Sequence, residues 1–84
     1  MDILILKFLN AYGKAEERIE ICQRKLDDLT LHQASRNYWN SLLRSTCGRI
    51  GAYVCMLDDI YHTIPMGDSV AYEDLRKWHE RMDG

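Results

Sequence analysis

Hydrophobic residues recur at alternating intervals of three and four positions along the first third of the chain. The series runs Ile5, Phe8, Tyr12, Ala15, Ile19, Cys22, Leu26 and Leu29. In an α-helix this spacing brings every member to one side, as at the a and d positions of a heptad repeat. Because the series keeps its phase across Gly13, we predict one helix over about residues 3–28. A helix broken at Gly13 is the alternative.

A second series with the same spacing predicts a second long helix, over about residues 31–64. It runs Trp39, Leu43, Thr46, Ile50, Tyr53, Leu57, Ile60 and Ile64. Pro65 ends this helix, because proline lacks the amide hydrogen that a helix interior requires. Thr30 and Gln33 have the spacing of a capping box at its start, and Ser35 is an alternative cap.

The two apolar series can bury each other if the chain folds back on itself near position 33. No glycine or proline stands between Gly13 and Gly48, so this turn, placed within residues 29–36, is weakly marked. One uninterrupted helical rod is therefore the alternative. We favour an antiparallel helical hairpin, because a straight rod could bury its apolar side only against partner chains.

A short third helix is predicted over about residues 69–82, with Asp68 or Ser69 as its cap. Its apolar positions are Ala71, Leu75, Trp78 and Met82. In an antiparallel hairpin the second helix ends beside the start of the first, so the third helix is expected to pack there, where further apolar side chains lie outside the first series. These are Ile3, Leu4, Leu6 and Leu9. The fold class is thus all-α, a single helical domain over residues 1–84.

Composition narrows the functional classes. The chain has 11 basic and 13 acidic residues and a net charge of −2, so direct nucleic-acid binding is not expected. Its three cysteines cannot all pair within one chain, which favours a reducing, cytoplasmic location. The apolar start is interrupted by Lys7, unlike a signal peptide, and no apolar stretch is long enough to span a membrane.

Charge is distributed unevenly along the chain. Residues 29–57 contain three arginines and no acidic residue, whereas residues 58–84 contain three basic and seven acidic ones. Arginine together with aromatic residues is typical of protein interfaces. We therefore predict a partner-binding site that consists of Arg36, Tyr38, Trp39, Asn40, Arg44 and Arg49. Two other interpretations stay open. In one, Trp39 belongs to the core and the arginines pair with Asp27, Asp28 or other acids of the first helix; in the other, the acidic C-terminal third makes the contact.

Small residues gather on one side of the second predicted helix. They are Cys47, Gly48, Gly51, Ala52 and Cys55. Small side chains let helix backbones approach closely, so this side predicts a tight helix crossing. Its partner would be the first helix, the third helix or the same side of a second subunit, and we expect a homodimer.

The chemistry-bearing side chains do not predict an enzyme. Cys55, Asp59 and His62 share one helical side, and Asp58 lies four residues before His62. A histidine paired with a nearby aspartate explains this spacing, because no second dense ligand cluster such as Cys-x-x-Cys is present, so we assign no metal site and no cofactor. The sequence also contains no glycine-rich phosphate loop and no serine elbow.

These observations predict a small non-enzymatic protein that binds a larger protein and acts as an inhibitor or regulator by occupying its surface. In size and composition the chain resembles small phage-encoded inhibitors of host systems. Residues 58–65 read DDIYHTIP and resemble a helix end of the haemolysin-expression-modulating nucleoid proteins, which implies a partner of a DNA-binding regulator. A nucleotide-binding or small-ligand module, with phosphates held by Arg44, Arg49 and Tyr53, is a further alternative.

Overall fold

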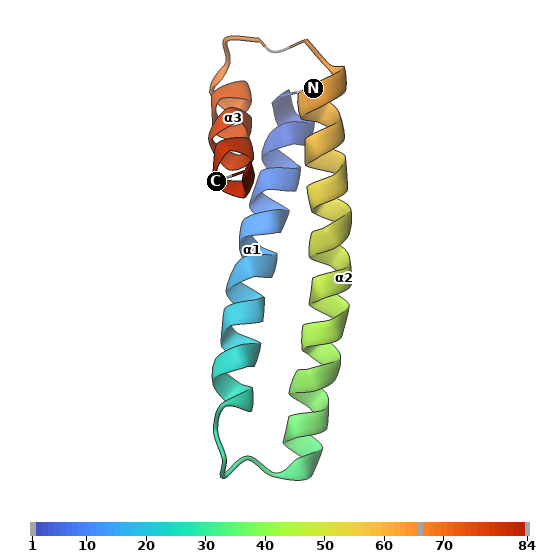
Figure 1. Ribbon diagram of the computed structural model, residues 1–84, viewed down its shortest axis with the longest axis vertical. Helices are drawn as coiled ribbons and strands as arrows, with labels where there is room; N and C mark the ends of the chain where they lie inside the picture. The colour runs from blue at the N-terminus through green and yellow to red at the C-terminus, as the bar shows by residue number, and fades with distance from the viewer. Residues whose placement is uncertain (1, 66, 84) are drawn as a thin grey trace.

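The computed structural model describes residues 2–65 and 67–83, which form three α-helices and no strand. Helix α1 spans Asp2–Leu26, α2 spans Gln33–Thr63 and α3 spans Val70–Asp83. The first two helices run antiparallel, and α3 lies against the N-terminal half of α1 (Figure 1). The predicted hairpin with a short third helix is confirmed, and α1 passes through Gly13 without a break.

The two heptad series meet along the hairpin as expected. Ile5, Cys22 and Leu57 are completely buried, and Thr46 is 1% exposed. The Thr46 hydroxyl donates to the backbone carbonyl of Leu42, which satisfies this buried polar group. The last member of the first series was assigned wrongly: Leu29 is 92% exposed, because α1 ends three residues before it.

The turn between α1 and α2 differs from the predicted capping box. Helix α2 begins after His32, whose side chain makes no capping hydrogen bond. Thr30 instead bonds to Asp28, with its amide and its hydroxyl 2.9 Å and 2.7 Å from one carboxylate oxygen. This local bond turns the chain directly after α1 and leaves Thr30 outside α2. Neither Thr30 nor Ser35 therefore caps the second helix.

The carbonyls at the C-terminal end of α1 are satisfied by a residue of α2. Arg36 donates to the carbonyl oxygen of Leu26 at 3.0 Å and to that of Asp28 at 2.9 Å. The last carbonyls of a helix have no partner within that helix, so the bond to Leu26, the last residue of α1, replaces a hydrogen bond that would otherwise be missing. The carbonyl of Asp28 also accepts from the amide of Leu31 at 3.2 Å. Arg36 thus joins the two helices at the turn.

Helix α3 closes the main hydrophobic core. Its residues Ala71, Leu75 and Trp78 are buried at 2%, 0% and 3% exposure. Tyr12 packs edge-on against the Trp78 ring, with centroids 5.8 Å apart, and its hydroxyl lies 3.2 Å from the sulfur of Met82. Burial, together with the nearby Glu16 carboxylate, raises the pKa of Tyr12. We call this part of the molecule the three-helix end and the opposite part, with residues 27–32, the turn end.

The contact between α3 and α1 is narrower than predicted. Ile5, Leu9 and Tyr12 of α1 belong to the core that α3 covers. Ile3, Leu4 and Leu6, which were expected to lie beneath α3, remain 74%, 44% and 44% exposed. Leu6 lies at the edge of the groove between α1 and α3, beside Trp78, and remains partly open to solvent. A single short helix covers only one side of α1, so α3 does not bury all of these side chains.

The start of α3 also lacks the expected side-chain cap. The carbonyl of Ser69 accepts the first helical hydrogen bond, from the amide of Glu73, so Ser69 occupies the capping position. Its own hydroxyl is buried without a hydrogen-bond partner among residues 2–65 and 67–83. Arg76 fixes the preceding loop instead, by donating to the carbonyl of Gly67 at 2.9 Å.

Candidate functional site

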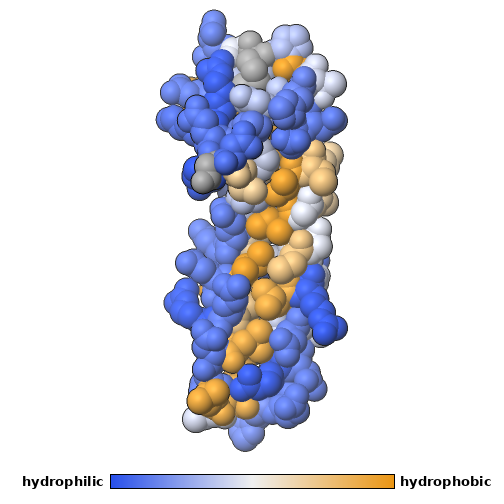
Figure 2. Space-filling view, viewed as in Figure 1, coloured by the Kyte–Doolittle hydropathy of each residue, from blue (hydrophilic) through white to orange (hydrophobic). Residues whose placement is uncertain are grey.

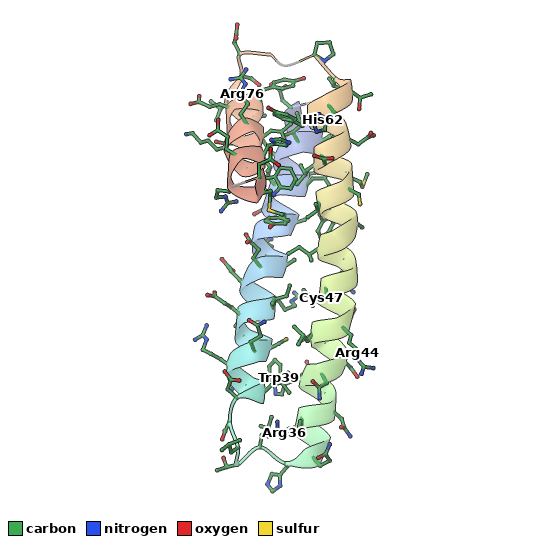
Figure 3. The ribbon with its side chains drawn as sticks, viewed as in Figure 1. Arg36, Trp39, Arg44, Cys47, His62 and Arg76 are labelled. Atoms are coloured by element: carbon green, nitrogen blue, oxygen red, sulfur yellow. The ribbon has the colours of Figure 1, made fainter. Side chains whose placement is uncertain are left out.

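The predicted partner-binding residues lie in the turn-end half of α2 but point in different directions. Figure 3 shows Arg36 folded into the turn and Trp39 between the two long helices, whereas Arg44 points away from α1. Tyr38 is 61% exposed, and Asn40 and Arg49 are exposed as well. The six predicted residues therefore do not form one continuous surface.

Arg36 has a structural task, as described for the turn. The same turn lowers the pKa of Asp28, mainly through the hydroxyl and amide of Thr30 and to a smaller extent through Arg36. A lowered pKa means that Asp28 stabilises the turn at neutral pH, and that this contribution is lost as the pH falls through the lowered value. Arg36 thus has the structural role that was one prediction, but it bonds to the backbone carbonyl of Asp28, and the described residues show no ion pair between Arg36 and Asp27 or Asp28.

Two aromatic residues mark the turn end. Trp39 is half-buried in the seam, the line along which the apolar series of α1 and α2 meet. Its ring packs edge-on against that of Tyr38, with centroids 5.1 Å apart. The ammonium group of Lys25 lies 5.9 Å from the centroid of the Trp39 ring, within the range of a cation–π contact. Trp39 therefore combines a packing role with a cationic neighbour, and Tyr38 is the more accessible of the two rings.

Arg49 belongs to a cluster of basic side chains that crosses both long helices. A shallow depression of about 160 Å³ is lined by Lys14 and Arg18 of α1, by Thr46, Arg49 and Tyr53 of α2, and by two alanines. No acidic residue lines it, and within the described chain none of its three cations forms an ion pair. We call Lys14, Arg18, Lys25 and Arg49 the cationic face.

Sequence reasoning missed the α1 half of this face. Lys14, Arg18 and Lys25 recur at intervals of four and seven, which places them on one side of α1 beside the apolar series. That periodicity was available in the sequence. It went unused because residues 1–28 as a whole contain more acidic than basic side chains.

The acidic residues of α1 occupy another part of its surface. Glu16, Glu17 and Glu20 border a different depression, together with Ile19 and Ile50. The two signs of charge are therefore largely separated around α1. No acidic residue lines the depression that holds Lys14, Arg18 and Arg49, whereas Lys25 lies close enough to Asp28 to contribute to its lowered pKa. Like charges brought together without partners raise the free energy of the isolated chain, and an anion bound there lowers it.

The hairpin below α3 leaves part of its apolar seam uncovered. Ile19, Leu43 and Ile50 are only half-buried, although Cys22 and Thr46 in the same part of the hairpin reach 0% and 1% exposure. Figure 2 shows a band of apolar residues that continues along the groove between α1 and α2 toward the turn end. Apolar surface of this kind marks interaction sites in soluble proteins.

The small residues of α2 do not form the tight crossing with α1 or α3 that was one expectation. Cys47, Gly48, Gly51, Ala52 and Cys55 are all exposed. A Cβ atom added to Gly48 or Gly51 would meet no other atom within 4 Å. Of the three predicted partners, α1 and α3 are therefore wrong, and a second subunit stays a prediction.

Comparison with protein-family models finds no matching family, and comparisons with curated proteins and with solved structures find no match either. Among the described residues, none of the helices combines the length and the hydropathy needed to cross a bilayer.

Proposed function

We propose that this chain is a non-enzymatic interaction protein that binds an acidic surface of a larger protein through its cationic face. It acts as an inhibitor or regulator because a helical rod, 50 Å long and about 20 Å wide, covers the surface that it occupies. The observation that supports the proposal is the unpaired basic cluster of Lys14, Arg18 and Arg49 around one depression.

The size of the depression favours a protein partner over a nucleotide. Pockets that bind small ligands typically enclose about 300–1,000 Å³, whereas this depression holds about 160 Å³. It accommodates a single anionic group, such as the carboxylate of a partner side chain. Arg49 and Tyr53 line it, as the nucleotide alternative requires, but Arg44 does not. The aromatic rings of Tyr38 and Trp39 supply additional contact area toward the turn end.

The charge reversal Arg49→Glu is expected to weaken partner binding at least tenfold, because it places a like charge opposite the acidic partner. Proteins captured from host-cell extract by immobilised wild type are compared with those captured by Arg49→Glu and Arg18→Glu. The captured partner is then purified, and its dissociation constant is measured for each variant. Far-UV circular dichroism checks that the variants keep their helicity.

Arg44→Glu is the matched control, since Arg44 is also an exposed arginine of α2 but points away from α1. We expect its dissociation constant to stay within about twofold of wild type. Equal weakening by both reversals would mean a general charge effect. Weakening by Arg44→Glu alone would assign binding to the other side of α2, and either result contradicts the proposal.

We further propose that the chain forms a homodimer through the small-residue side of α2. Residues 14–49, which form the turn-end half, hold seven basic and five acidic side chains, and the rest of the chain holds four and eight. An antiparallel two-fold pair places the basic half of one rod beside the acidic half of the other. Gly48 and Gly51 lie near the middle of α2, where the two helices of such a pair cross.

Gly51→Leu is expected to convert this dimer into a monomer, because the added side chain separates the two backbones. Sedimentation equilibrium measures the effect as at least a tenfold weaker self-association. Gly13→Leu is the control, since Gly13 of α1 has equally open surroundings. A wild-type chain that is monomeric at high micromolar concentration, or a dimer unaffected by Gly51→Leu, would rule out this interface.

A further inference from the structure

Two helices bring together, at the three-helix end, three side chains of the types that can coordinate a metal ion. Asp58 and His62 belong to the last two turns of α2, and His79 belongs to α3. Oδ1 of Asp58 lies 3.3 Å from Nε2 of His62 and 3.6 Å from Nε2 of His79. One ligand atom from each residue lies within 4.8 Å of the other two.

The composition of this cluster differs from the set singled out in the sequence. Asp59 is bonded to the hydroxyl of Thr63 and does not belong to the cluster, and neither does Cys55. His62 does pair with an aspartate four residues earlier, as expected. The additional member, His79, comes from α3, 17 positions after His62 along the chain. Spacing within α2 could not reveal it.

The two distances from Asp58 resemble those between ligands around a metal ion more than those of direct hydrogen bonds. Charge-assisted hydrogen bonds between nitrogen and oxygen are about 2.7–2.9 Å long, and both Asp58 distances exceed that range. Around a tetrahedral zinc ion, bonds of about 2.0–2.1 Å place neighbouring ligand atoms about 3.3–3.4 Å apart. The two Asp58 distances, 3.3 Å and 3.6 Å, are close to this spacing, and the ligand atoms of the two histidines lie within 4.8 Å of each other.

His79 is held in the orientation that a ligand requires. Its ring stacks on Tyr61, with centroids 3.8 Å apart and planes inclined by 9°. Its second nitrogen, Nδ1, lies 3.4 Å from a carboxylate oxygen of Asp83. A carboxylate at Nδ1 favours the tautomer that carries its proton there, which leaves the lone pair of Nε2 directed toward Asp58. Metal-binding histidines commonly have such a second carboxylate.

We propose that Asp58, His62 and His79 bind a divalent cation of the zinc class, which joins α3 to α2. Two imidazoles and one carboxylate are a ligand set that zinc accepts, and a water molecule completes the tetrahedron. The side chains of Asp58 and His62 are 53% and 62% exposed, so an ion can enter from solvent. His79 is only 14% exposed and anchors the site on the α3 side.

The test is a titration of chelator-treated, full-length protein with Zn²⁺, measured by isothermal calorimetry and by the shift in melting temperature. We expect one ion per chain and a higher melting temperature, because an ion bound only by the folded state stabilises it. His62→Gln removes a ligand and is expected to weaken binding at least tenfold, and Asp83→Asn is expected to weaken it by about ten- to hundredfold.

The control is His32→Gln, which alters a histidine in the turn at the other end of the rod and should leave the affinity unchanged. Asp58→Asn replaces a second proposed ligand and serves the same purpose as His62→Gln. Circular dichroism reports whether each variant is folded. Unsaturable binding to wild type, or equal affinity of wild type and His62→Gln, would overturn the proposal. So would loss of binding in Cys55→Ser instead, since that result assigns the ion to a thiol. The cationic-face variant Arg49→Glu should bind Zn²⁺ normally, which separates this test from that of the proposed function.

Discussion

Replacing Trp78 with alanine is expected to destabilise the protein by about 3–5 kcal/mol, the range for a large aromatic residue removed from a core. Trp78 is 3% exposed and packs edge-on against Tyr12, so its loss leaves a cavity where α3 meets α1. A chain of 84 residues has a total stability of only about 4–13 kcal/mol. Helix α3 should therefore be largely detached from α1 in this variant.

Thermal and urea unfolding measure this effect. In a domain of this size each kcal/mol shifts the melting temperature by about 4–8 °C, so a decrease of more than about 12 °C is expected. Trp78→Phe retains one aromatic ring and removes part of the indole, whose N–H has no hydrogen-bond partner in the described chain, so it leaves a smaller cavity than alanine and its effect should be smaller. Trp39→Ala, at the half-buried tryptophan of the turn end, should also cost clearly less. Equal losses at the two tryptophans would contradict the location of the core.

Arg36→Ala is expected to cost about 2–3 kcal/mol, because hydrogen bonds from charged donors contribute about 1.5–3 kcal/mol each and this side chain is only partly buried. The substitution removes two bonds at once, to the carbonyls of Leu26 and Asp28. The end of α1 then loses the partner that joins it to α2. Chemical denaturation measures the loss, and amide exchange in residues 27–32 should accelerate.

The comparison that isolates the role of Arg36 is Arg44→Ala. Arg44 is exposed and forms no ion pair within the described residues, so this change should stay within about 0.5 kcal/mol of wild type. Arg36→Lys keeps the charge but cannot reach both carbonyls with one planar group, so it should restore only part of the stability. Full recovery with lysine would show that the charge alone matters, contrary to the bonds described.

The helices could be predicted because one property, the spacing of apolar residues, determines both where they form and how they pack. Ile5 and Leu57, far apart in sequence, are completely buried because each belongs to a heptad series. The details of the turn depend on competition between local partners. Thr30 was equally suited to cap α2 or to bond with Asp28, and only the folded chain shows that Asp28 is its partner.

The candidate sites were less accessible to sequence reasoning, because both combine residues from separate helices. Arg49 was predicted from its own acid-free segment, but Lys14 and Arg18 join it only once the hairpin closes. His79 approaches Asp58 only once α3 folds back onto the hairpin. The pattern within one helix identifies only the residues that this helix contributes to such a site. The remaining residues depend on which other helix packs beside it.

Because α3 packs against only one end of the hairpin, the two ends should differ in how often they open. The turn-end half is held together only by the contact between α1 and α2. It should exchange its amide hydrogens soonest, since regions with few buried contacts open at the lowest free energy. That half also contains most of the cationic face. A partner that binds there therefore stabilises the less stable half of the chain. Slower amide exchange in that half alone would locate the contact before the structure of a complex is known.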